Sequence, residues 1–458
     1  MGEPGDRCHA RLAAQGLIVL TRRKFLGATA AAAGGLAGAG LVSSCSSVLP
    51  EPDVQAAGFG QDATGTVQVW CRAATQSGLT DLVKKFNASQ DRLTVELTPV
   101  LDAQYVTKLA TAIRGRSVPD LVDIDDINSM LFIYRDAFTD LTEPLSALDF
   151  RDRLSPGHLR LATKGDRVYG VPYLADNSMF WFNTELCDRA DVDPDEAVKS
   201  FGNLLDAARK LRKLGDDIYA WSFPANSPGA LGFVVQPMIW AADTDLIKGV
   251  VPDQSGDIVG NDAVRQMLEL HRQLWVDGLV PRANFSDDAS RWGSDFRAGK
   301  VGIFPSNYSV VVSASDAAFH KKVTPRLLSG PDGGAAFFDG GDNMCIPRGA
   351  RNASGAWEFV RFALDLPQQI DLPAGGYTPV RSDARTSEFA AKYPLATLPL
   401  ERIQEGYAPT TLSYNLLYNQ PDGPWLQMFR RAVFDGELEA AMKEAQQNFD
   451  RILRQGQA

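Results

Sequence analysis

The chain has 458 residues, of which 45% are hydrophobic and 22% are charged, a composition typical of soluble globular proteins. It exceeds the roughly 100–200 residues of an ordinary domain, so we expect two or more compact units. The formal net charge of -10 argues against a nucleic-acid partner, because binding to phosphates requires a basic surface.

The amino terminus predicts an export signal. Arg22 and Arg23 precede an Ala/Gly-rich apolar run, as in twin-arginine signals. The run ends in Val42-Ser43-Ser44-Cys45, which resembles a bacterial lipobox and makes Cys45 the lipidated first residue of the mature protein. A transmembrane helix is the alternative, since about 20 apolar residues can span a bilayer, but glycines within the run weaken such a helix. We expect residues 1–44 to be a signal peptide and the body to sit at the outer face of the cytoplasmic membrane, in the periplasm or cell envelope.

Cysteine and histidine usage excludes the common metal sites. Cys71, Cys187 and Cys345 remain in the body and allow at most one disulfide. The sequence has no CxxC pair, and the three histidines of the body lie far apart. We therefore expect no metal and no cofactor.

The first part of the body predicts an α/β lobe. Residues 45–64 are rich in Ser, Pro, Gly and Ala, which predicts a flexible tether, and the fold is expected to begin near Thr66. Apolar periodicity predicts strands at residues 67–69, 93–97 and 121–124, and helices at residues 79–86 and 105–113. Ser77 is the expected N-cap of the first helix. Strands that alternate with helices predict a largely parallel sheet.

The same alternation continues in a second α/β unit. Strands are expected at residues 179–182, 219–223 and 301–304, with a helix at residues 204–211, and the longest helices at residues 264–275 and 438–452. His271 falls on the apolar stripe of its helix, so we interpret it as a packed core histidine rather than a ligand.

Motifs of catalysis are missing from the sequence. It has no GxSxG elbow, no HExxH, no phosphate loop ending in GK[ST] and no GxGxxG after a strand. The adjacent pairs Asp125-Asp126 and Asp287-Asp288 cannot flank a glycosidic bond, where the two carboxyl groups sit roughly 5–10 Å apart. We expect a protein that is not an enzyme.

Five motifs resemble, in order, those of the maltose-binding-like solute-binding proteins of ABC sugar importers. They are VPDLVDIDD at residues 118–126, VYGVPY at 168–173 followed by FWFN at 180–183, FRAGKVGI at 296–303, the pair Gly340-Gly341 with IP at 346–347 and AWEFVRF at 356–362, and GYTPVR at 376–381. The resemblance covers nearly all of residues 66–455, and the relatives closest in character are actinobacterial lipoproteins.

This resemblance implies an α/β, two-lobed periplasmic-binding-protein fold with hinge-crossing segments and a ligand cleft between the lobes. We expect residues 65–173 and 328–374 to form the N-terminal lobe, and residues 174–327 and 375–458 the C-terminal lobe. The implied function is that of a monomeric lipoprotein that captures a carbohydrate and delivers it to ABC permease subunits with a cytoplasmic ATPase.

Candidate ligand contacts follow the strand ends, where open α/β sheets place ligands. Trp70 follows the first strand and is a candidate to stack on a sugar ring, with core packing as the alternative. Asp125 and Asp126 end the third strand and are candidate hydroxyl acceptors, with helix N-capping as the alternative. Asp176 with Asn177 follows the first hinge motif, and a turn role is the alternative.

The later motifs supply further candidate contacts. These are Asn307, Tyr308, Gly340, Gly341, Asp342, Asn343, Tyr377 and Arg381. The glycines would let backbone approach the ligand, and the Arg381 fork could hold hydroxyls, a carboxylate or a phosphate. Ser306, Asn307 and Tyr308 replace a tryptophan common in the family, which leaves the ligand class open.

Three alternatives remain at this point. The same fold could bind glycerol phosphate or a glycerophosphodiester, for which Arg72 is a further, isolated cation. A secreted carbohydrate-active enzyme would require two facing carboxylates in the cleft. A surface adhesion or scaffold role would leave the cleft featureless.

Overall fold

The computed structural model describes residues 62–312 and 317–456. The predicted export signal with Arg22 and Arg23, the predicted lipidation residue Cys45, and the predicted tether up to residue 61 lie outside the described residues.

The described residues build a ten-stranded mixed sheet with the order β2-β1-β3-β13-β6-β10-β7, to which β11, β12 and β14 add by pairing with β6 or β13. Its strands are β1 (Gly65–Arg72), β2 (Leu93–Val100), β3 (Leu121–Asp125), β6 (Val171–Asn183), β7 (Tyr219–Trp221), β10 (Val301–Asn307), β11 (Val323–Arg326), β12 (Leu328–Gly330), β13 (Gly333–Cys345) and β14 (Gly406–Tyr407). Two small hairpins complete the strands, β4 (Thr163–Lys164) with β5 (Arg167–Val168), and β8 (Ile247–Val250) with β9 (Asp253–Gly256).

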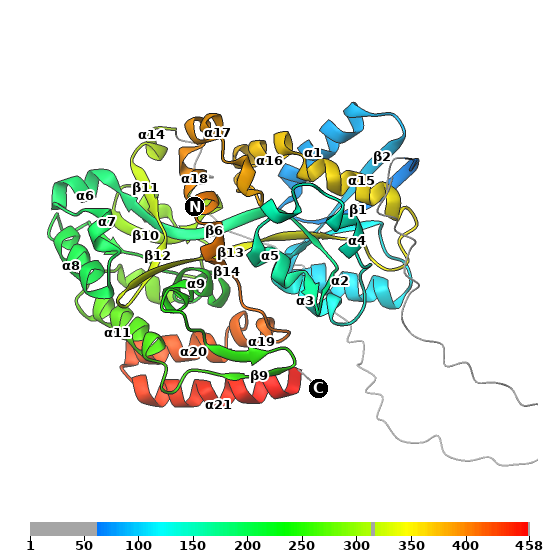
Figure 1. The fold of residues 1–458 in the computed structure, drawn as a ribbon. Helices are drawn as coiled ribbons and strands as arrows, with labels where there is room; N and C mark the ends of the chain where they lie inside the picture. The colour runs from blue at the N-terminus through cyan, green and yellow to red at the C-terminus, as the bar shows by residue number, and fades with distance from the viewer. Residues whose placement is uncertain (1–61, 313–316, 457–458) are drawn as a thin grey trace, which may run out of the picture. The chain divides into compact units, whose positions relative to one another are not determined.

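Two long strands connect the halves of the sheet. β1 runs parallel to β2 and β3, as the alternation of strands and helices predicts. β13 is antiparallel to both β3 and β6, and β6 is antiparallel to β10. With 13 residues each, β6 and β13 pass from the half that contains β1 to the half that contains β10 (Figure 1).

Helices cover both halves of the sheet (Figure 1). Those of the β1 half are α1 (Gln76–Ser89), α2 (Asp102–Arg114), α3 (Asp126–Ile133), α4 (Thr142–Ser146), α5 (Pro156–Leu161), α15 (Ala353–Leu364) and α16 (Leu366–Asp371). The remaining helices are α6 (Thr184–Ala190), α7 (Pro194–Ala197), α8 (Phe201–Arg212), α9 (Pro228–Val235), α10 (Pro237–Trp240), α11 (Asp262–Val276), α12 (Ser294–Arg297), α13 (Tyr308–Val312), α14 (Ala317–His320), α17 (Ser387–Lys392), α18 (Thr397–Glu401), α19 (Tyr414–Tyr418), α20 (Pro424–Arg430) and α21 (Leu438–Gly456).

Separate hydrophobic clusters support the two halves. Strand β1 alternates exposed and buried residues, so that Val67, Val69 and Cys71 enter a cluster with α1 and α15. A second cluster on α2 and α3 contains Tyr105 and Phe138. The largest cluster fills the β10 half and includes Phe338, which the sequence assigned to the N-terminal lobe. The exact lobe boundaries therefore stay a prediction.

The start of α1 differs from the sequence-based expectation. The helix begins at Gln76, and Thr75 occupies the N-cap position without a side-chain cap. Ser77, the expected cap, lies inside the helix. The Thr75 hydroxyl instead donates to the Asp123 carboxylate on β3, so a contact across the sheet replaces the local cap.

Three further features bear on the sequence predictions. Cys71, Cys187 and Cys345 are buried and free, so the described residues contain no disulfide. His271 is fully buried against Phe223 and Phe429, in agreement with the interpretation of a core residue. No helix within the described part of the chain combines the length and apolar character needed to cross a membrane.

Candidate functional site

A cavity of about 190 Å³ lies where the ends of β1 and β3 meet the crossing strands. Its lining residues come from both halves of the sheet and are Arg72, Ala74, Thr75, Asp125, Asp126, Ile127, Leu174, Asp176, Phe233, Asn307, Ser309, Phe338, Gly340, Gly341, Asp342 and Tyr377. Arg72 is the last residue of β1 and Asp125 the last of β3. Because these strands are parallel, their carboxyl ends meet at one edge, where open α/β sheets bind ligands.

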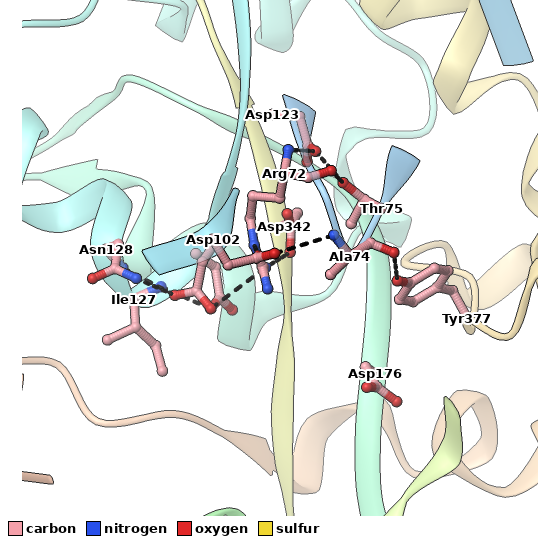
Figure 2. A network of polar contacts seen from close by, with 12 residues as sticks. Arg72, Ala74, Thr75, Asp102, Asp123, Ile127, Asn128, Asp176, Asp342 and Tyr377 are labelled. Carbon is pink, nitrogen blue, oxygen red and sulfur yellow. Dashed lines mark hydrogen bonds and ion pairs between the residues drawn. The ribbon is translucent and has the colours of Figure 1, made fainter. Parts of the chain in front are cut away.

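Arg72 organises the carboxylates at this edge (Figure 2). Its Nη1 lies 2.5 Å from Asp342 Oδ1 and 3.5 Å from Asp125 Oδ2, and its Nε donates to Asp102 Oδ1 at 2.9 Å. Although burial alone would lower the pKa of Arg72, Asp342 and Asp125 raise it well above its ordinary value. The guanidinium is therefore a permanent cation that is already surrounded by acceptors.

Asp342 and Asp123 lie behind this cation. Asp342 reaches the cavity from β13, opposite Asp125 in the strand register, and Asp123 Oδ2 accepts from the Arg72 backbone N at 3.2 Å. Burial raises the pKa of Asp342 well above its ordinary value, against the opposing effect of Arg72. Asp342 Oδ2 is buried and accepts no hydrogen bond from a protein donor, and the neighbouring Asp123 carboxyl adds to the rise in the pKa of Asp342. The site thus holds more carboxylate than the one arginine neutralises.

A second buried cluster supports Asp126. His158 on α5 is fully buried, with Nε2 at 3.4 Å from Asp126 Oδ2 and Nδ1 at 3.2 Å from Asp339 Oδ2. Burial would lower the pKa of His158, but Asp339 and Asp126 raise it to about 9, so the ring is an imidazolium at neutral pH. Burial raises the pKa of Asp126. The histidine thereby partly neutralises an acidic residue that lines the cavity.

The cluster also joins the crossing strands. Asn177 on β6 donates to Asp339 Oδ1 on β13 at 2.7 Å, and Ser155 Oγ donates to Asp339 Oδ2 at 2.6 Å. A Cβ added to Gly341 would lie 2.2 Å from the Leu174 carbonyl oxygen and 2.7 Å from His158 Nε2. Only glycine at position 341 lets β6, β13 and the imidazole approach this closely.

Asp176 projects from β6 toward the β10 half. Its Oδ1 accepts from the Ser309 backbone N at 2.9 Å, and its Oδ2 accepts from Ser309 Oγ at 2.6 Å and from Asn307 Nδ2 at 3.3 Å. Burial raises the pKa of Asp176, while the bonds from Ser309 and Asn307 oppose that rise. In Figure 2 its side chain stands apart from the Arg72 group, on the strand that crosses below it.

Aromatic rings supply the apolar part of the lining. Phe233 from α9 and Phe338 from β13 meet edge to face with ring centroids 4.8 Å apart. Tyr377 donates its hydroxyl hydrogen to the Ala74 carbonyl at 2.9 Å and closes another side (Figure 2). Sequence reasoning missed both phenylalanines. Phe338 lies two residues before Gly340 on one strand, a period-two signal, whereas nothing local distinguishes Phe233 within its apolar helix.

The structure brings eight of the predicted residues to this cavity. They are Asp125, Asp126, Asp176, Asn307, Gly340, Gly341, Asp342 and Tyr377. Asp125 also caps α3, since its Oδ1 accepts from the Asn128 backbone N at 3.2 Å. The N-capping role considered for it is therefore present, and its contact with a solute stays a prediction. Asp176 lies within a strand and not in a turn.

Five predicted residues lie outside the cavity lining. The Trp70 ring packs under Lys108, whose Nζ is 4.3 Å from its centroid. Asn177 is buried and bonded to Asp339, and Tyr308 is buried against Trp181. Asn343 is fully buried and donates to Ser129 Oγ. We therefore do not propose these four residues as ligand contacts.

Arg381, the fifth, serves the packing of the β1 half. Its guanidinium stacks 3.8 Å from the Phe150 centroid and donates to both Asp383 oxygens and to the Leu364 carbonyl. The side chain is 8% exposed, which leaves its fork unavailable to a solute in the cavity. The turn motif by itself could not show in which direction the Arg381 side chain points.

Comparison with known proteins identifies the family. Residues 81–397 match the family model described as bacterial extracellular solute-binding protein. The chain belongs to this family. The predicted family resemblance is thus confirmed, and so is the prediction that the chain is not an enzyme, because the family consists of binding proteins.

Individual relatives are distant but match over nearly their whole length. The sn-glycerol-3-phosphate-binding periplasmic protein UgpB of Rhizobium meliloti is 23% identical over 88% of this chain and 95% of its own. The sugar-binding protein MalE of Xanthomonas citri superposes with a TM-score of 0.74 at 19% identity, over 85% of this chain and 98% of its own. A solute-binding protein of Thermotoga lettingae, solved with α-D-tagatose, gives 0.69 at 19% identity, over 85% and 100%. The predicted two-lobed α/β fold is confirmed.

The buried histidines predict opposite pH dependences of stability. Because folding raises the pKa of His158 from 6.5 to about 9, the folded state binds the extra proton, and the free energy of unfolding should fall as the pH rises through that range. Burial lowers the pKa of His271 to about 4, so the unfolded state binds the extra proton. The free energy of unfolding should therefore also fall as the pH drops from 6.5 toward 4. Denaturant unfolding at pH 4 to 10 measures both.

Substitutions assign the two slopes. His158→Gln should remove the loss of stability at alkaline pH and keep the loss of stability at acidic pH. His271→Leu should do the reverse. An alkaline slope that persists unchanged in His158→Gln would show that the slope does not arise from His158.

Arg381→Ala tests whether this arginine is structural. We expect the free energy of unfolding to fall by about 2–4 kcal/mol, because Asp383 loses its partner and the Phe150 face its cation. The affinity for any solute that the wild-type protein binds should change by less than about threefold. A stable variant that no longer binds solute would contradict the structural role and show that Arg381 contributes to solute binding.

Proposed function

We propose that the protein is the substrate-binding lipoprotein of an ABC importer and that it captures a sugar. The sugar is a mono- or an oligosaccharide, and amino sugars are included in this class. The observation that carries this proposal is the combination of carboxylates and aromatic rings in one cavity between the two halves of the sheet. Sugar hydroxyls need hydrogen-bond partners on desolvation, at a cost of about 1–3 kcal/mol for each one left unpaired. Phe233, Phe338 and Tyr377 offer surfaces for the apolar faces of the ring.

The size of the cavity favours a compact solute. Its volume of about 190 Å³ lies below the roughly 300–1,000 Å³ of pockets for drug-sized ligands. A longer saccharide would have to extend past Tyr377, whose hydroxyl closes one side against Ala74.

Lobe closure is the proposed mechanism of capture. Asp125 and Arg72 belong to one half, Asn307 and Ser309 to the other, and Asp176 lies on a strand that connects them. A solute that contacts both halves binds the closed state better than the open state and shifts the population toward it. The permease would recognise the closed protein, and its cytoplasmic ATPase would supply the energy.

A glycerol phosphate compound is the second candidate, because the UgpB relative is named for that ligand. The charge of the cavity favours the sugar instead. Arg72 is the cationic side chain of the lining, and its guanidinium already contacts Asp102, Asp125 and Asp342. A phosphate dianion would meet carboxylates that repel it.

Calorimetric titration of the purified protein tests the sugar proposal. The probes are glucose, galactose, maltose and glucosamine, with sn-glycerol 3-phosphate as the competing class. We expect saturable binding of a sugar, weakened by about 10–100-fold in Asp176→Asn, since a charge-assisted hydrogen bond is worth about 1.5–3 kcal/mol. Asp152→Asn, at a carboxylate that is 92% exposed, is the matched control and should bind normally. Binding of the phosphate alone would favour the second candidate.

Cys45→Ser tests the proposed anchor. The protein should move from the membrane fraction to the soluble exported fraction, because the thiol that would carry the lipid is lost, while binding stays unchanged. Retention in the membrane fraction would contradict lipidation at Cys45.

A further inference from the structure

Negative charge exceeds positive charge in and directly behind the cavity. Among the described residues the carboxylates there are Asp102, Asp123, Asp125, Asp126, Asp176, Asp339 and Asp342, and the cations that contact them are Arg72 and His158. Burying uncompensated charges of one sign is costly, so such a site must retain protons or receive a cation from outside.

Two lining carboxylates each have an oxygen that no hydrogen-bond donor of the protein reaches. Asp126 is fully buried, and its Oδ2 has only the ion pair with His158 at 3.4 Å. Asp342 is 2% exposed, and its Oδ2 accepts no hydrogen bond from a protein donor. Asp125 Oδ2 has only a loose contact with Arg72, at 3.5 Å. These acceptors lie around one cavity at the ends of neighbouring strands.

We propose that the solute carries a protonated amine, as an amino sugar does, and that the carboxylates of Asp125 at the end of β3 and Asp126 at the start of α3 receive this ammonium group. The inference rests on the proposed function and narrows it to a class of sugar. An ammonium group has three donors and no acceptor, so it matches a wall of carboxylates better than a hydroxyl does. The sugar ring would lie against Phe233 and Phe338.

A metal ion does not meet the same need. No group of His, Cys, Asp or Glu within the described ranges has an arrangement that could hold one. An organic cation instead brings its own apolar carbon frame, which uses the aromatic part of the lining as well as the acidic part.

The inference also predicts proton release on binding. Burial raises the pKa of Asp126, Asp176 and Asp342, so these groups retain protons to a higher pH than ordinary carboxyl groups do. A ligand cation would take over the compensation of charge and displace those protons. A neutral sugar would leave them in place.

Paired probes test the inference in the full-length protein. We would titrate glucosamine, galactosamine and mannosamine against glucose, galactose, mannose and the N-acetylated forms, by calorimetry in buffers of different ionisation enthalpy. At least one amino sugar should bind about tenfold or more tightly than its neutral parent and its N-acetyl form, with proton release that the neutral sugars lack.

Asp125→Asn is the diagnostic variant, because asparagine still caps α3 but removes the charge. It should reduce the preference for the amino sugar over its neutral parent by about tenfold. If Asp125 had only a structural role, the substitution would lower the affinity for both sugars by the same factor. Asp126→Asn should also reduce the preference and gives a second reading if one variant folds poorly. Asp152→Asn remains the exposed control.

The outcomes separate the inference from the proposed function. A neutral sugar that binds as tightly as its amino counterpart, or better, overturns the inference and leaves the sugar proposal intact. Absence of binding for every amino sugar at about 10 mM also overturns it, since a built site should reach a lower Kd. Binding of sn-glycerol 3-phosphate alone overturns both.

Discussion

The antiparallel pairing of β6 with β13 is the constraint on which the rest of the structure depends. These strands run through both halves. The buried hydrogen bond from Asn177 to Asp339 joins them, and Ser155 donates a second buried hydrogen bond to Asp339. Gly341 permits the close approach. Because the same strands carry Asp176 and Asp342, the geometry that connects the halves also sets the spacing of the solute-binding groups.

Electrostatic balance is the second organising feature. Arg72 and His158 each compensate two or more carboxylates, and neither is free to act on a solute alone. In a region of low dielectric such networks are stable only when charges are paired or protonated. The cavity therefore holds more carboxylates than its cations compensate, and a ligand that compensates them would bind favourably.

Much of the fold was accessible from the sequence because its signals are local. Alternating and helical periodicity located β1, β2, β3 and their intervening helices, and the motif at residues 118–126 placed Asp125 and Asp126 at a strand end. Composition and missing motifs argued correctly against an enzyme. Strand ends and turn motifs are short-range features, so a single sequence carries them in full.

The tertiary structure alone decided which side chains face the cavity. Arg381 follows the predicted turn and Tyr308 begins α13, but their side chains pack against Phe150 and Trp181 and are buried there. His158 and Phe233 reach the site from helices with no local marker. The sequence by itself determined the family and the strand ends. The directions of side chains such as His158 and Arg381 depended on Asp339 and Phe150, which lie more than 100 residues away along the chain.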